Sequence, residues 1–181
     1  MDRQTIINKI LEIDKTEKPV GRYDLLPLFQ YNDIFSEIVN ILSEPYFDKI
    51  DYVISPEAIG WILGSSIARK LKTGFIPIRK GNKLPYSKEK LFTYNYEEYS
   101  NVEKIYKQKS IEIKKDLIEN NSKILIVDEW IESGSTVNAC MKLLEKMNCK
   151  IIGIATIGVD ENENTKEWIE NDFITYVGKN I

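Results

Sequence analysis

Hydrophobic positions along this chain recur with two periods, one typical of amphipathic helices and one of buried strands. Both occur between Lys123 and Asn148. Ile124 to Val127 is an apolar run that predicts a parallel strand covered on both faces. Ile151 to Ile157 predicts a second such strand. Between the two strands, apolar residues return at the spacing of a helix's buried face, at Val137, Cys140, Met141, Leu144 and Met147.

The order strand, helix, strand predicts a βαβ unit, whose first loop lies at the carboxyl end of the sheet, where open α/β folds bind ligands. The same two periods continue on either side. Helices are predicted at 3–14, 35–42, 56–71 and 164–171, and strands at 49–55, 74–78 and 173–177. Tyr86 to Gln108 has neither period. We therefore expect one α/β domain over residues 1–181, with a doubly wound, mostly parallel sheet flanked by helices.

Size and composition exclude several classes of protein. A net charge of -3 offers no bulk positive charge for nucleic acid. No apolar run has the length of a membrane span, and the N-terminus lacks a signal peptide's apolar core, so we expect a cytoplasmic protein without a membrane partner. The absence of histidine excludes Ser-His-Asp and Cys-His catalysis and the commonest zinc sites. Cys140 and Cys149 are expected to be reduced thiols.

The polar turn after the first strand has the chemistry of a phosphate site. Backbone N–H groups are free at the start of a helix, and three hydroxyls add donors, in the run Ser133, Gly134, Ser135 and Thr136. Asp128 and Glu129 precede it and would repel a phosphate, so their expected partners are sugar hydroxyls or a hydrated divalent cation. The turn therefore predicts a ribose phosphate site. Neither a Walker loop nor a G-x-G-x-x-G after a strand occurs.

Two segments of the chain resemble the type I phosphoribosyltransferase family. Residues 124–136, ILIVDEWIESGST, are similar to the family's phosphoribosyl pyrophosphate (PRPP) motif, in which two acids precede Thr/Ser-Gly-x-Thr. Residues 53–85, VISPEAIGWILGSSIARKLKTGFIPIRKGNKLP, are similar in order and spacing to a segment of the adenine phosphoribosyltransferases. The two motifs also occur in the family's order.

The resemblance implies a fold and a reaction. The family has a small N-terminal hood, expected here within residues 1–48, and a flexible lid or hairpin, expected at 84–113. Its members transfer the phosphoribosyl group of PRPP to a base with Mg²⁺ and release pyrophosphate. For this chain the resemblance favours a purine acceptor, adenine first, and a homodimer.

The resemblance also assigns roles to residues. Asp128 and Glu129 would hold the ribose hydroxyls, directly or through magnesium and water, and stabilise an oxocarbenium-like transition state. Residues 133–136 would anchor the 5′-phosphate. Pyrophosphate would be bound by Arg79, Lys80, Lys83 and Glu57. From the residues alone, Glu57 after Pro56 also fits an acid at a helix start, and the cations also fit a solvated basic turn.

The base site rests on weaker matches. The hood would bring Val20, Arg22 and Tyr23 to the purine, although a structural turn with Arg22 in solvent fits as well. The family's lid carries a Glu-Tyr pair near the base. The candidates for that pair here are Glu103 and Tyr106.

Two positions depart from the pattern of the adenine enzymes. Ile59 replaces an arginine that helps to hold pyrophosphate. Glu132 replaces an alanine, whereas the hypoxanthine and guanine enzymes have an aspartate there that handles a purine proton. Glu132 is therefore a candidate general acid or base, a sign of another acceptor base, or an exposed loop acid without a role.

A second hypothesis comes from the same fold. Some proteins of this fold sense PRPP or nucleotides without catalysis, usually with an added DNA-binding element. No such element is visible before Val20, which favours an enzyme.

Overall fold

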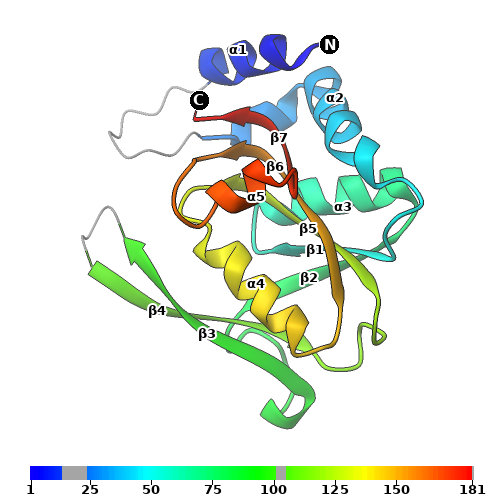
Figure 1. Ribbon diagram of the computed structural model, residues 1–181, viewed down its shortest axis with the longest axis vertical. Coiled ribbons are helices and arrows are strands. Elements are labelled where there is room, and N and C mark those ends of the chain that lie inside the picture. The colour runs from blue at the N-terminus through cyan, green and yellow to red at the C-terminus, as the bar shows by residue number, and fades with distance from the viewer. Residues whose placement is uncertain (14–23, 101–104, 181) are drawn as a thin grey trace.

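The computed structural model describes residues 1–13, 24–100 and 105–180. Within these residues seven strands form one sheet in the order β3-β4-β2-β1-β5-β6-β7 (Figure 1). The parallel strands are β1 (Tyr52–Pro56), β2 (Gly74–Lys80), β5 (Lys123–Ile131), β6 (Lys150–Val159) and β7 (Ile174–Lys179). The antiparallel strands are β3 (Leu91–Ser100) and β4 (Ile105–Lys114), and β4 pairs with β2. The predicted mostly parallel sheet is confirmed.

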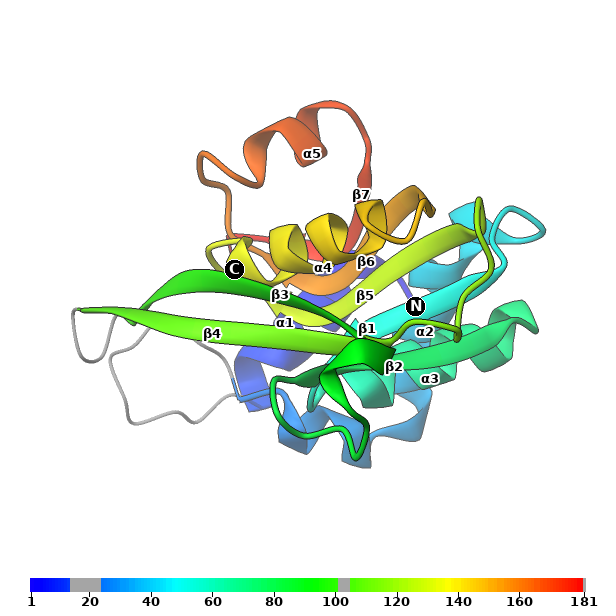
Figure 2. The ribbon, with the colours of Figure 1, turned by 90° about the horizontal axis from the view of Figure 1, so that it is seen from below.

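Helices cover both faces of the sheet, as the sequence predicts (Figure 2). One face carries α1 (Arg3–Ile13), α2 (Asn32–Ser43) and α3 (Gly60–Leu71). The other carries α4 (Ser135–Glu145) and α5 (Lys166–Glu170). Short 3-10 turns are η1 (Leu26–Gln30), η2 (Glu44–Tyr46) and η3 (Lys88–Lys90). Of the helices described, none has the length and apolar character needed to cross a bilayer.

The central strand β5 divides the core in two. Leu125 and Val127 pack in the cluster beneath α1, α2 and α3, whereas Ile124 and Ile126 pack in the cluster beneath α4. All four side chains are fully buried. Side chains alternate across a strand, so a strand covered on both faces must be apolar throughout, which is the pattern seen in the sequence.

Of the boundaries that differ from the sequence prediction, two bear on the site. β5 continues past the acidic pair to Ile131, because residues up to that position still pair with β6. Helix α3 begins at Gly60 rather than at Pro56, which is the last residue of β1. The intervening turn is held by Trp61 Nε1, which donates to the Ser55 carbonyl at 3.0 Å. The Glu57–Ala58 peptide within this turn is cis.

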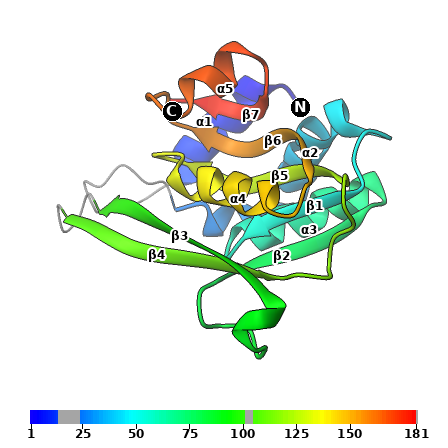
Figure 3. The same ribbon diagram turned by 60° about the horizontal axis from the view of Figure 1, so that its bottom comes forward.

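The region predicted to lack periodicity contains the long β3–β4 hairpin, which extends beyond the rest of the sheet (Figure 3). The two-residue period of a strand is present in this region, but the residues on its buried side are aromatic. Phe92, Tyr94 and Tyr96 are partly buried against the core beneath α4, while Thr93 and Asn95 between them are exposed. The prediction of an irregular segment is therefore wrong, although the expectation of a hairpin here is met.

Candidate active site at the carboxyl ends of β1, β2 and β5

Three loops meet at one edge of the sheet. β2, β1 and β5 are parallel neighbours, so the turns that follow them lie side by side at their carboxyl ends. These turns contain Glu57, the cationic residues after Arg79, and residues 132–134. The fold thus gathers the segments that the sequence proposed for pyrophosphate, ribose and phosphate.

Asp128 and Glu129 both lie against the start of α3. A Cβ atom added to Gly60 would be 3.1 Å from Asp128 Oδ1 and 3.4 Å from Glu129 Oε2. The positive end of this 12-residue helix favours carboxylates at that position. Both side chains are only half-buried, so a ligand can reach them. The structure therefore brings the predicted acids together and adds the first turn of α3 as a third wall.

The acid pair borders the helix and the hairpin on the other face of the sheet. Burial raises the pKa of the Cys140 thiol on α4, and the charge of Asp128 raises it further. Burial also raises the pKa of Tyr96 on β3, with a smaller contribution from Asp128. Asp128 is thus close enough to both groups for its charge to act on them. Cys140 and Cys149 are free thiols, as predicted.

The loop before α4 has the geometry of a phosphate site. Gly134 has φ of +77°, a left-handed conformation that glycine adopts without strain, and α4 starts at the next residue. The hydroxyls of Ser133 and Ser135 lie 2.9 Å apart. Hydroxyl groups and the N–H groups of the first helical turn thus lie together at the positive end of an 11-residue helix, with the Ser135 N–H donating to Ser133 Oγ at 3.4 Å.

The hairpin contacts this phosphate loop. Thr136 Oγ1 donates a hydrogen bond to Glu98 Oε1 on β3 at 3.3 Å. Glu98 in turn forms an ion pair with Lys109 on β4. A carboxylate from the hairpin therefore already occupies one of the predicted phosphate donors.

At the end of β2 the predicted cations are in two different environments. Arg79 Nε lies 3.0 Å from Glu57 Oε2, and the Arg79 guanidinium lies 5.2 Å from the centre of the Trp61 ring. The interpretation of Glu57 as an acid that opens the helix is wrong, because Glu57 precedes Gly60 by three residues and pairs with a cation instead. Lys80 and Lys83 are exposed and face solvent.

Sequence reasoning did not identify Glu112, a buried carboxylate on β4 that organises this turn. Glu112 is 4% exposed. Its two oxygens accept the backbone N–H groups of Asn82, Lys83 and Leu84 at 3.0, 2.8 and 2.7 Å. Charged acceptors form strong hydrogen bonds with backbone N–H groups, so Glu112 fixes the path of the turn. The only sequence signal was an acid between two isoleucines in a buried strand.

Glu132 is half-buried in the phosphate loop, so it is not the exposed acid that one interpretation of the sequence expected. Its charge contributes to a raised pKa at Asp160, where burial is the larger cause. Ile59 directly precedes α3, where the family has arginine. Tyr106 is 70% exposed and is preceded by Ile105, not by an acid. Val20, Arg22, Tyr23 and Glu103 lie outside the described residues.

A metal at this site would need ligands from its substrate. Among the described residues no group of three or more acidic or sulfur side chains could hold a metal ion. The pair Asp128 and Glu129 offers at most two carboxylates. Mg²⁺ is commonly bound by one or two carboxylates together with water and substrate phosphates, so the pair fits a magnesium ion that arrives with a diphosphate.

The chain is similar to known proteins over most of its length. Residues 29–179 match the phosphoribosyl transferase domain family. The chain is 36% identical over 143 residues to the adenine phosphoribosyltransferase of Thermotoga maritima, covering 78% of each protein. It is 30% identical over 158 residues to the enzyme of that name from Pseudothermotoga lettingae, covering 84% of this chain and 88% of that one.

Solved structures show the same fold. The Giardia lamblia APRTase, complexed with 9-deazaadenine, superimposes with a TM-score of 0.82 at 22% identity, covering 100% of this chain and 99% of that chain. The adenine phosphoribosyltransferase of Thermoanaerobacter pseudethanolicus superimposes with a TM-score of 0.80 at 24% identity, covering 96% of this chain and 99% of that chain. At these identities the likeness concerns the fold.

Proposed function

Because the chain belongs to the phosphoribosyltransferase family, we propose that it transfers the phosphoribosyl group of PRPP to a purine base and releases pyrophosphate. One observation carries the proposal. Asp128 and Glu129 lie side by side against Gly60, on the strand that leads directly into the phosphate loop. The acids thus lie next to the phosphate loop, as the ribose hydroxyls lie next to the 5′-phosphate in ribose 5-phosphate.

The site residues divide the substrate between them. The N-terminus of α4 and the hydroxyls beside it hold the 5′-phosphate, away from the reacting atoms. Asp128 and Glu129 hold the ribose hydroxyls and stabilise the positive charge that develops on the ring as the bond to pyrophosphate breaks. Lys80 and Lys83 face the leaving group, whose negative charge increases at the same moment.

Magnesium is part of this proposal. When bound with PRPP, it supplies positive charge that stabilises the departing diphosphate. The acid pair would hold it, directly or through water, together with substrate oxygens.

Adenine is the acceptor that we propose first, because the named relatives are adenine phosphoribosyltransferases. Glu132 keeps a 6-oxopurine as the second candidate, since a half-buried carboxylate in this loop can exchange a proton with a base. We also propose a homodimer, on the family resemblance alone. Light scattering coupled to size-exclusion chromatography tests the dimer.

The experiment that tests the function is a turnover panel. Purified protein is given PRPP and Mg²⁺ with adenine, hypoxanthine, guanine, xanthine, uracil or orotate, and pyrophosphate release is measured. Release with adenine supports the proposal. Release with a 6-oxopurine instead makes that base the acceptor and supports Glu132 as the group that exchanges a proton with it.

A double variant, Asp128→Asn with Glu129→Gln, tests the role of the acids, with Glu145→Gln on the exposed side of α4 as the matched control. We expect the double variant to lose turnover and the control to keep it. Turnover near the wild-type rate in the double variant would show that the acids do not stabilise the ribose cation.

A second candidate is a non-catalytic PRPP sensor. Ile59 favours it, because an apolar residue replaces the family's pyrophosphate-binding arginine at the start of α3. For a sensor, PRPP raises the melting temperature while every base in the panel fails to release pyrophosphate.

A further inference from the structure

The turn between β6 and α5 lies directly behind the phosphate loop. Asn162 Nδ2 donates to the Glu132 carbonyl at 2.7 Å, and Asn164 Nδ2 donates to the Ser133 carbonyl at 2.9 Å. Gly134 is enclosed by the same turn, since a Cβ added there would lie 3.3 Å from Asn164 Cβ. Two amide side chains thus donate to two successive carbonyls of the loop.

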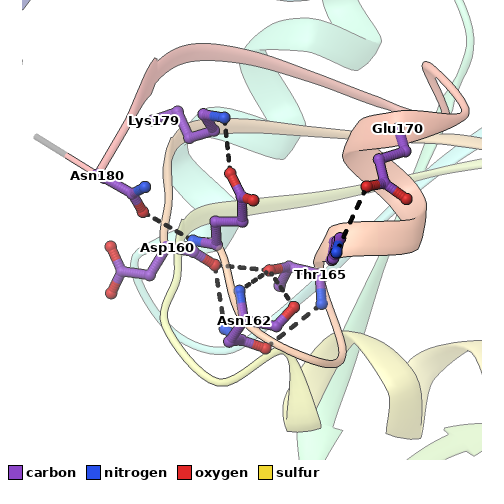
Figure 4. Close-up of polar contacts among 8 residues, drawn as sticks. Asp160, Asn162, Thr165, Glu170, Lys179 and Asn180 are labelled. Carbon is purple, nitrogen blue, oxygen red and sulfur yellow. Dashed lines mark hydrogen bonds and ion pairs between the residues drawn. The ribbon is translucent and has the colours of Figure 1, made fainter.

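This turn is held by hydrogen bonds among its own residues (Figure 4). Thr165 is fully buried, and its hydroxyl donates to the Asp160 carbonyl at 2.6 Å and accepts the Asn162 N–H at 2.9 Å. Asn162 Oδ1 accepts the Asn164 N–H at 3.0 Å. Local bonds of this kind fix the backbone around an asparagine. The positions of both donating amides are therefore set by the turn itself.

The direction of the carbonyls determines the direction of the N–H groups that face the ligand. Both peptides concerned, 132–133 and 133–134, are trans. In a trans peptide the C=O of one residue and the N–H of the next point in opposite directions. When Asn162 and Asn164 hold the carbonyls on one side, the N–H groups of Ser133 and Gly134 must point to the other side, where residues 133–136 form the phosphate site.

We propose that Asn162 and Asn164 are positioning residues for the 5′-phosphate of the phosphoribosyl substrate. This inference rests on the proposed function for the identity of the substrate, but not for the geometry. The two residues contact the loop and not the ligand. They keep its donors aimed at the phosphate, so the loop need not reorganise on binding.

Asn164 provides the cleaner test, because the bonds of Asn162 also build the turn. Asn164→Ala removes the donor but keeps the Cβ that packs against Gly134. Asn164→Asp keeps the shape, replaces the donor by an acceptor and adds negative charge. Asn171→Ala, at the exposed end of α5, is the matched control.

Binding of ribose 5-phosphate and of inorganic pyrophosphate is measured separately by calorimetry. We expect Asn164→Ala to weaken ribose 5-phosphate roughly fivefold, the factor for one lost neutral hydrogen bond, and Asn164→Asp to weaken it further. Pyrophosphate affinity stays within about twofold, the limit below which an effect on one hydrogen bond is not resolved. In turnover, the KM for PRPP rises and kcat at saturation is retained, because the loop takes no part in the chemistry.

Three outcomes overturn the inference. One is unchanged ribose 5-phosphate affinity in both Asn164 variants. The others are an equal loss for ribose 5-phosphate and pyrophosphate, and an equal loss in Asn171→Ala, either of which indicates a general structural effect. The proposed function fails separately: if ribose 5-phosphate affinity depends on Asn164 but the wild-type protein turns over no base, the positioning role stands and the enzymatic function does not.

Discussion

The buried carboxylate of Glu112 accepts the backbone N–H of Lys83 at 2.8 Å. This bond connects β4, a strand of the hairpin, to the cationic turn at the end of β2. Three N–H groups of this turn donate to a protein carboxylate, so a pyrophosphate bound there, as we propose, would be recognised by side chains. Lys80 and Lys83 are the exposed cations placed to do so.

Replacing Glu112 tests this connection. Glu112→Ala leaves three backbone N–H groups without their acceptor, and we expect it to lower the free energy of unfolding by about 2–4 kcal/mol. Glu112→Gln keeps one acceptor oxygen and should cost less. Both should weaken pyrophosphate more than ribose 5-phosphate. Urea unfolding and calorimetry check this, and equal stability of the two variants would contradict the hydrogen-bond argument.

Gly60→Ala tests the contact between α3 and the acid pair. The new methyl group would lie 3.0 Å from Ser55 Oγ and 3.1 Å from Asp128 Oδ1, so the carboxylate must move. The required shift is a few tenths of an ångström. Because a misplacement of about 1 Å can cost about 100-fold in rate, we expect kcat to fall by up to about 10-fold. Ser65→Ala on the exposed side of α3 is the control. Unchanged kcat in Gly60→Ala would show that Asp128 is not positioned by this contact.

Glu98→Gln tests the contact between hairpin and phosphate loop. The Glu98 carboxylate accepts from the Thr136 hydroxyl and repels an incoming phosphate. We therefore expect the variant to bind ribose 5-phosphate several-fold more tightly at low salt, with a smaller gain at high salt. The neighbouring exposed Glu97→Gln removes the same charge and is the control. An equal gain in both would mean that net charge alone is responsible.

Asp160 makes stability depend on pH. Burial, helped by the charge of Glu132, raises its folded-state pKa above 3.8, so folding favours the protonated form. Wild-type stability from this group is therefore greatest at low pH and is lost as pH rises through the folded-state pKa. Asp160→Asn should be slightly more stable than wild type at pH 7, with the advantage disappearing on acidification. Thermal unfolding of both proteins is measured from about pH 3.5 to 7, a range in which a carboxyl group with a raised pKa titrates. A difference in melting temperature that does not change with pH would contradict the prediction.

Periodicity predicted most of the fold, because a helix or strand that is buried on one or both faces needs apolar residues at regular positions in the sequence. Ile124 to Val127 predicted a strand covered on both faces, and the helix after Gly134 followed from its spacing. Periodicity did not reveal the two strands of the hairpin, because two of the three partly buried aromatic positions on β3 are tyrosines in a segment rich in charge. The start of α3 was misplaced because Pro56 followed by Glu57 resembles a helix start.

The part of the candidate site that lies in one continuous segment could be predicted from the sequence. The part that forms where distant segments meet could not. The acids and the phosphate loop are contiguous in sequence, and the structure places them as a unit. Glu112 and Asn164 act on loops that lie about 30 residues away along the chain. A side chain that binds another segment's backbone has no periodicity and no motif of its own, so only the tertiary structure reveals it.

The turn behind the phosphate loop follows β5 and α4 along the chain. Glu161 joins it to the last residues of the chain, through an ion pair with Lys179 at 2.6 Å and a bond from its N–H to Asn180 Oδ1 at 2.8 Å. A chain growing from its N-terminus completes β5 and α4 before Asn162, Asn164 or β7 exists. The phosphate loop is therefore translated before the turn that supports it, and its carbonyls have no partner from Asn162 or Asn164 until the chain has passed β6.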